Sequence, residues 1–173
     1  MRSLPPTFEP VGTAAVLVTA ATAAAIDVRT GRIPNPLTAA AAMTGLALAG
    51  VGLTSVTLTL AIVGGVLGFA LMLPGRLFGA TGGGDVKLMA ALGTLLGPRH
   101  VVIAFLAGAI AGGALALGHA WHRGRVATTL SRTARFATDP AAAKAAIDEA
   151  APETRFAYGP ALAVGAIFAT LWH

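Results

Sequence analysis

The feature that most limits how this chain can fold is a series of apolar segments whose lengths approach that of a membrane span. A transmembrane helix needs about 20 mostly apolar residues. Only 11% of the residues are charged, whereas soluble globular domains average about a quarter. These features predict an all-α polytopic membrane protein with about six transmembrane helices, forming one domain over residues 1–173. The predicted segments are approximately Val11–Ile26, Pro36–Leu53, Ser55–Leu73, Val86–Gly97, Val101–Ala120 and Phe156–Trp172.

The 22 glycines fit a membrane protein, because small side chains let two membrane helices approach each other closely. Two glycine pairs have the four-residue spacing that places both members on one face of a helix. These pairs are Gly64-xxx-Gly68 and Gly108-xxx-Gly112. We therefore expect both pairs at contacts between helices.

The basic residues predict the orientation of the chain, because Lys and Arg are enriched in the cytoplasmic connections of membrane proteins. Of the twelve Lys and Arg residues, only Arg2 and Arg99 fall on one side of the predicted spans. The other ten are Arg29, Arg32, Arg76, Lys87, Arg123, Arg125, Arg132, Arg135, Lys144 and Arg155. The cytoplasm is therefore expected beside Asp27, Asp85 and the long polar loop at about 121–155. The net charge of +5 then reflects topology, and no nucleic-acid partner is expected.

Two of the seven acidic residues, Asp27 and Asp85, lie at the ends of apolar helices. An ionised side chain at the bilayer centre costs roughly 2.5–3.5 kcal/mol on insertion scales, so both are candidate functional residues. Two neighbouring carboxylates can share a proton, so that one acts as a base on water while the other donates to a carbonyl oxygen. That is the chemistry of an aspartic protease. Taken singly, each acid could instead be an interfacial residue paired with Arg29 or Lys87.

The helix ends suggest which carboxyl group holds the shared proton. Asp85 begins its predicted helix, where the macrodipole stabilises negative charge, whereas Asp27 ends its helix, where the macrodipole opposes negative charge. On this basis, Asp27 is the candidate for the protonated partner.

Three glycines, Gly82, Gly83 and Gly84, directly precede Asp85 in the stretch GGGD. Backbone without side chains is open to the close approach of an extended peptide, and it can adopt unusual angles at the start of a helix. The spacing does not match a phosphate-binding loop, because Lys87 does not follow the last glycine directly. The absence of cysteine excludes disulfides, thiolate zinc sites and a cysteine nucleophile.

Three stretches of the chain resemble the type IV prepilin peptidase family. GGGD is a G-x-G-D motif, the signature of intramembrane aspartyl proteases. DVRTGRIPN at 27–35 resembles the family's first-aspartate motif, in which Ile-Pro-Asn follows the aspartate. FAYGPAL at 156–162 resembles the Tyr-Gly-Pro stretch that opens a late helix. The three motifs occur in the family's order.

This resemblance implies an endopeptidase of the bacterial inner membrane that cuts the basic leader from type IV or Flp-like prepilins. The cut would follow a glycine at the cytoplasmic face. Asp27 and Asp85 carry over as the catalytic pair, with Gly82 and Gly84 as the motif glycines. Substrate-binding or motif support is assigned to Lys87, Pro34, Asn35, Tyr158, Gly159 and Pro160. The expected partners are a prepilin or pseudopilin, the lipid bilayer and the pilus assembly machinery, and water as nucleophile requires no cofactor.

The chain departs from the larger members of that family, which carry an N-terminal region with paired cysteines and also methylate the new N-terminus. It resembles the minimal form associated with Flp, or tight-adherence, pili, so methyl transfer is not expected. An alternative is a small membrane transporter or proton relay that uses Asp27 and Asp85. A transporter would more often hold its acids near the middle of the membrane. A structural partner of a secretion machine would need no G-x-G-D motif.

Overall fold

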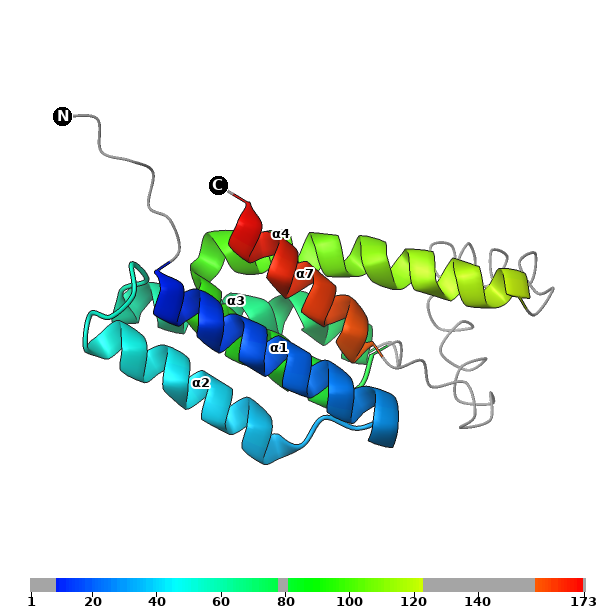
Figure 1. The fold of residues 1–173 in the computed structure, drawn as a ribbon, viewed down its shortest axis with the longest axis horizontal. Helices are drawn as coiled ribbons and strands as arrows, with labels where there is room; N and C mark the ends of the chain where they lie inside the picture. Colours follow the sequence, from blue (N-terminus) through cyan, green and yellow to red (C-terminus); the bar gives the residue numbers. More distant parts are fainter. Residues whose placement is uncertain (1–8, 78–80, 123–157, 173) are drawn as a thin grey trace.

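The computed structural model describes residues 9–77, 81–122 and 158–172, and every regular element within them is an α-helix (Figure 1). The all-α prediction is therefore confirmed. The helices are α1 (Pro10–Thr30), α2 (Asn35–Gly50), α3 (Leu58–Leu77), α4 (Gly83–His122) and α7 (Gly159–Leu171). The predicted loop at 121–155 lies outside the described residues, apart from its first two positions.

Proline and glycine explain where several helices begin and end. Pro10, Pro36 and Pro160 lie in the first turns of α1, α2 and α7, where a missing N–H leaves no helical hydrogen bond unmade. Helix α1 ends at Gly31, which has φ 62 and donates its N–H to the carbonyl oxygen of Asp27. A left-handed residue at this position is readily supplied by glycine.

Helix α4 is broken at Gly97, whose φ of 72 and ψ of 175 are not helical, and Pro98 follows. A straight helix would separate Asp85 from Gly112 by about 40 Å. Instead, Gly112 contacts the ring of Tyr158, and Asp85 lies within range of the same side chain electrostatically. Helix α4 therefore folds back into two arms, residues 83–97 and 98–122, as the ribbon in Figure 1 also shows.

The described helices differ in whether they are long and apolar enough to cross a membrane. Within the described residues, three helices are long and apolar enough to cross a membrane: α1, α3 and α4 as far as Ala116, a stretch that includes the break at Gly97. Helix α7 is a shorter apolar helix, and α2 has 16 residues. The six predicted segments correspond to α1, α2, α3, the two arms of α4 and α7. About six crossings are nevertheless not confirmed, because only three helices in the described part of the chain reach the length and hydropathy of a span.

The first arm of α4 forms the centre of the bundle. Its buried side chains Leu88, Met89 and Leu92 are fully enclosed, and they belong to one apolar cluster with residues of α1 and α7. The clustered residues on those two helices are Val16, Ala20, Ala23, Leu162, Ala163, Ala166 and Ala169. The first arm of α4 is therefore held in place on the side that faces α1 and α7.

Close contacts between glycines join α3 to the first arm of α4. A methyl group on Gly64 would collide with the carbonyl oxygen of Gly93, and one on Gly93 would collide with that of Gly64. Gly68 lies equally close to the carbonyl oxygen of Met89. On the second arm, a Cβ at Gly108 would lie 3.3 Å from the carbonyl oxygen of Ala161 in α7. The predicted role of the spaced glycines in helix contacts is thus confirmed.

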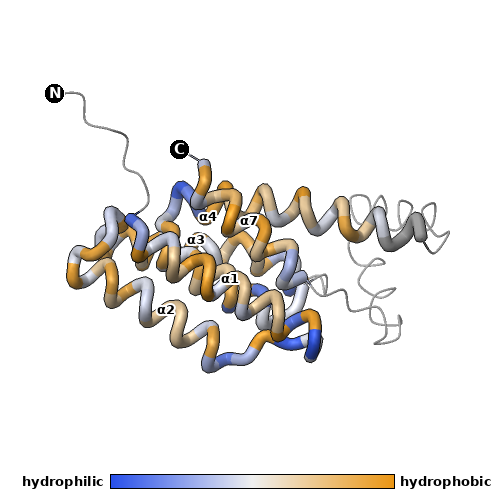
Figure 2. The backbone as a smooth tube through the Cα atoms, viewed as in Figure 1, coloured by the Kyte–Doolittle hydropathy of each residue, from blue (hydrophilic) through white to orange (hydrophobic). Residues whose placement is uncertain are grey.

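The hydrophilic residues of the described chain gather at the ends of the helices. Figure 2 shows apolar positions along most of the bundle, with hydrophilic positions gathered at the connection between α1 and α2 and, at the opposite end, near the break in α4. Arg29 and Arg32 belong to the first group, and Arg99 to the second. This arrangement agrees with the sides assigned to these residues from the sequence.

Replacing Gly93 by Ala is expected to destabilise the bundle, because the added methyl group has no space against the backbone of Gly64. Overpacking of this kind costs about 1–3 kcal/mol. Thermal unfolding of the purified protein in one detergent measures the effect. Gly113→Ala is the matched control, since a Cβ there meets nothing within 4 Å. Equal unfolding temperatures for the two variants would contradict the proposed α3–α4 contact.

Candidate active site

Asp27 lies in the last turn of α1 and is 5% exposed. Its Oδ2 accepts a hydrogen bond of 2.8 Å from the backbone N–H of Gly159, the first residue of α7. The first four N–H groups of a helix have no partner within that helix. The Asp27 carboxylate therefore satisfies one of these donors at the start of α7, although the two residues are far apart in the sequence.

Asp85 lies in the first turn of α4 and is 7% exposed. Its Oδ2 accepts a hydrogen bond of 2.9 Å from the backbone N–H of Gly82. An acidic side chain that reaches back across the first turn in this way resembles half of a capping box. Both carboxylates are thus buried, and each is bonded to a backbone N–H at the start of a helix.

An added Cβ would be crowded at two of the three glycines before Asp85. A Cβ at Gly82 would lie 3.1 Å from Asp85 Oδ2, and one at Gly84 would lie 3.0 Å from Ile33 Cβ. The nearest atom to a Cβ at Gly83 is Arg76 Nε at 3.7 Å, an ordinary contact. Gly82 and Gly83 are also exposed. The two glycines that the G-x-G-D motif specifies, Gly82 and Gly84, are therefore the two at which a Cβ would make a close contact.

The two aspartates are near neighbours in space. Asp27 and Asp85 lie within range of each other's charge, and Tyr158 is within range of the charge on Asp85. A Cβ at Gly112 would lie 3.0 Å from Tyr158 Cζ, so glycine leaves the space that the ring occupies.

A family model described as the type IV leader peptidase family matches residues 14–117. The chain belongs to the type IV leader peptidase family. No curated protein and no solved structure gives a significant match. The range matched by the leader peptidase family includes both aspartates and all three motif glycines, and it ends before α7.

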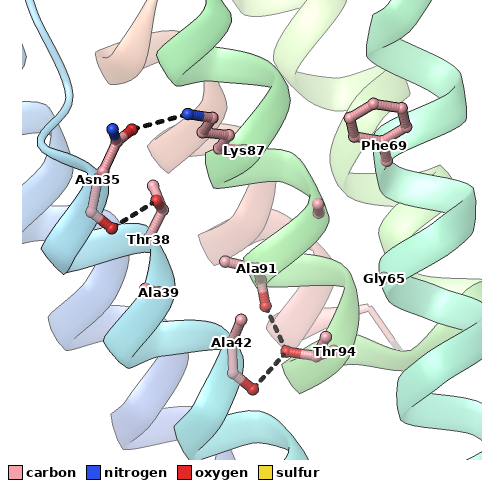
Figure 3. Close-up of a pocket in the computed structure, with 10 residues that line it drawn as sticks. Asn35, Thr38, Ala39, Ala42, Gly65, Phe69, Lys87, Ala91 and Thr94 are labelled. Atoms are coloured by element: carbon pink, nitrogen blue, oxygen red, sulfur yellow. Dashed lines mark hydrogen bonds between the residues drawn. The ribbon is translucent and has the colours of Figure 1, made fainter.

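Lys87 and Asn35, which the sequence grouped with the leader peptidase motifs, lie on another side of α4. The side chain of Lys87 donates a hydrogen bond of 2.9 Å to Asn35 Oδ1 (Figure 3). Lys87 is two residues after Asp85, which places it about 200° around the helix. Lys87 therefore links α4 to the start of α2 and points away from the aspartate pair. Pro34 immediately precedes α2 at its N-cap.

An open groove of about 510 Å³ lies beside Lys87, between α2 and α3 with α4 as its floor (Figure 3). Its lining residues are Asn35, Thr38, Ala39, Ala42, Gly65, Phe69, Lys87, Ala90, Ala91 and Thr94. Thr94 donates a hydrogen bond of 2.7 Å to the carbonyl oxygen of Ala91. Neither aspartate lines this groove, so it is a separate feature from the carboxylate pair.

The structure thus divides the site residues predicted for a leader peptidase into two groups. Asp27, Asp85 and the residues Gly82, Tyr158 and Gly159 come together on one side of α4. Lys87 and Asn35 lie on the other side. Ile33 was not assigned a role from the sequence, although it is buried against Gly84. Its position in the Ile-Pro-Asn motif is the sequence feature that could have pointed to this role.

No group of three or more His, Cys, Asp and Glu side chains that could hold a metal ion occurs in residues 9–77, 81–122 and 158–172. The acidic side chains of the site are the aspartate pair. Each carboxylate has one backbone donor, from Gly159 or Gly82. Two buried carboxyl groups within range of each other's charge are suited to acid–base chemistry.

Replacing Gly84 by Ala is expected to lower the unfolding temperature, whereas Gly83→Ala is expected to leave it unchanged or raise it. The methyl group at position 84 meets Ile33, and relieving such overpacking costs about 1–3 kcal/mol. The methyl group at position 83 is unobstructed, and Ala is more stable than Gly within a helix by roughly 0.5–1 kcal/mol. Thermal unfolding of both variants in the same detergent tests this difference, and the opposite order would refute the packing argument.

Proposed function

We propose that this chain is an aspartic leader peptidase that cuts the basic leader from type IV or Flp-like prepilins. The cut follows a glycine at the cytoplasmic face of the bacterial inner membrane. The observation that carries the proposal is the pair of buried carboxylates, Asp27 and Asp85, within range of each other's charge in a chain of the leader peptidase family.

In the proposed reaction, one carboxylate removes a proton from a water molecule, whose oxygen attacks the carbonyl carbon of the scissile peptide bond. The other carboxyl group donates its proton to the carbonyl oxygen. The tetrahedral intermediate then breaks its C–N bond, and the departing amine takes up a proton from the aspartate pair. The products are a carboxylic acid on the leader and an amine on the mature pilin. Atoms and charges balance without any other reactant.

The glycine segment supports a role in admitting the substrate. Gly82 and Gly83 are exposed beside Asp85. An extended peptide can approach a backbone that lacks side chains more closely than one that carries them. The exposed segment is therefore the proposed entry point for the residues around the scissile bond, while Lys87 and Asn35 support the α2–α4 contact.

The position of the acids favours the peptidase over the alternative proton relay or transporter. Each aspartate lies within one turn of a helix end, Asp27 in α1 and Asp85 in α4. Transporters more often hold such groups near the middle of the membrane. The proposed cytoplasmic orientation depends on the ten basic residues counted on one side of the chain. Methylation of the new N-terminus is not expected.

Asp27→Asn and Asp85→Asn are each expected to lower cleavage of a Flp-type prepilin by about 10²–10⁴-fold, the usual contribution of general acid–base catalysis. Asn keeps the size of the side chain but cannot exchange a proton. Mass spectrometry of the precursor and product after incubation with the purified protein measures the rate.

Glu9→Gln is the matched control, because it removes an exposed carboxylate outside the site. It should cleave like the wild type. Cleavage at the wild-type rate by either aspartate variant would refute the assigned pair. Failure of the wild-type protein to cut any prepilin, while correctly inserted in the membrane, would refute the peptidase reaction.

A further inference from the structure

The start of α7 is built around the side chain of Asp27. The Gly159 N–H donates to Asp27 Oδ2 at 2.8 Å, and this hydrogen bond is buried. Pro160, the next residue, has no N–H to offer. The carboxylate on α1 therefore acts as the N-terminal cap of α7, a role that usually belongs to a side chain just before the helix.

No residue larger than glycine fits at position 159 in this arrangement. A Cβ there would lie 2.7 Å from Asp27 Oδ2 and 2.8 Å from Asp27 Cβ. Rotation of the carboxylate could relieve the first contact. It could not relieve the second, because Asp27 Cβ is fixed to the backbone of α1. A side chain at 159 must therefore separate α7 from α1 or displace Asp27.

Gly159 adopts an ordinary helical conformation, so its backbone angles do not require glycine. The glycines with positive φ among the described residues are Gly31, Gly52 and Gly97. The three atoms nearest to a Cβ at 159 all belong to Asp27, so the requirement for glycine comes from the closeness of that side chain. Glycine is therefore required at position 159 to make room for the Asp27 carboxylate, and not to allow an unusual backbone conformation.

We propose that Gly159 is a positioning residue for Asp27. Its N–H fixes Oδ2, and its lack of a side chain lets the start of α7 contact the carboxylate directly, so that α7 holds Asp27 in place opposite Asp85. This inference rests on the proposed function, because it concerns the geometry of the same aspartate pair. It adds a helix that lies beyond the residues matched by the family model.

Electrostatics explains why a helix start serves this purpose. A backbone N–H and the positive end of a helix both stabilise a nearby negative charge. The donor is part of the main chain, so it cannot rotate away as a side chain can. Loss of the correct position would lower catalysis strongly, since a displacement of about 1 Å can cost about 10²-fold in rate.

The first experiment measures the contact itself, independently of cleavage. The chain contains one tyrosine, and Gly159 follows it. Labelling Tyr with ¹³C at the carbonyl and Gly with ¹⁵N therefore selects the Gly159 amide by NMR. We expect its hydrogen exchange to be at least tenfold faster in Asp27→Ala than in Asp85→Ala, because Asp27 is its acceptor. Equal exchange in the two variants would overturn the proposal.

The second experiment measures cleavage kinetics of Gly159→Ala in the full chain. We expect kcat to fall about 10–100-fold with KM changed less than about threefold, because the substrate still binds while Asp27 is displaced. Gly113→Ala provides the neutral control, since a Cβ there meets nothing within 4 Å. A kcat for Gly159→Ala equal to that of Gly113→Ala would overturn the positioning role.

A second control separates positioning from loss of packing. Gly165 lies on the same helix as Gly159 but away from Asp27. In Gly165→Ala, the added methyl group collides with the carbonyl oxygen of Ala104 and with Gly108. The two α7 variants should lose thermal stability, and Gly159→Ala should lose far more kcat. Equal losses of kcat in Gly159→Ala and Gly165→Ala would show that Gly159 contributes only to packing, and would overturn the positioning role.

The outcomes also separate this inference from the proposed function. A fully active Asp27→Asn variant would refute the catalytic role of Asp27, and the positioning role with it. An inactive Asp27→Asn variant beside a fully active Gly159→Ala variant would overturn the positioning role alone. If Gly159→Ala does not fold, the amide exchange measured in the two aspartate variants still decides whether Asp27 holds the start of α7.

Discussion

Burying two carboxylates in an apolar helix bundle is the constraint on which the rest of this structure depends. An acid at this depth is tolerated only where hydrogen-bond donors compensate for lost water. Asp27 and Asp85 each receive a backbone N–H at a helix start, one from Gly159 in α7 and one from Gly82 just before α4. Three helix ends must therefore meet at one point, and the glycines at 82 and 159 are what allows the carboxylates to approach those donors.

The break in α4 makes this meeting possible. The chain reverses at Gly97, so the second arm returns along α7 and places Gly112 beside the ring of Tyr158, near Asp85. A continuous helix would carry the second arm away from the site. The contact between Gly64 and Gly93 fixes the first arm against α3. Small residues thus determine the separation of the helices, and that separation determines how near the two acids lie.

The sequence was sufficient for the fold class, and it singled out the two acids that the structure buries, since apolar segments and isolated acids are local features of the chain. It was not sufficient for the number of crossings, because α2 and α7 are short and length alone does not distinguish a span from a buried helix. It also could not show that Lys87 faces Asn35 and not Asp85. The side of a helix on which a residue acts depends on its neighbours, and here those neighbours are 52 positions away.

The placement of the shared proton illustrates the same limit. The argument from α1 alone makes Asp27 the protonated partner, because a helix end of that polarity opposes negative charge by about 0.3–1 kcal/mol. The structure adds the start of α7, which donates a hydrogen bond to the same carboxylate. Hydrogen bonds to charged groups contribute about 1.5–3 kcal/mol, so the contribution of α7 outweighs that of α1. Asp27 and Asp85 then each have one backbone N–H donor, so a prediction made from the polarity of α1 alone omits the stronger of the two interactions at Asp27.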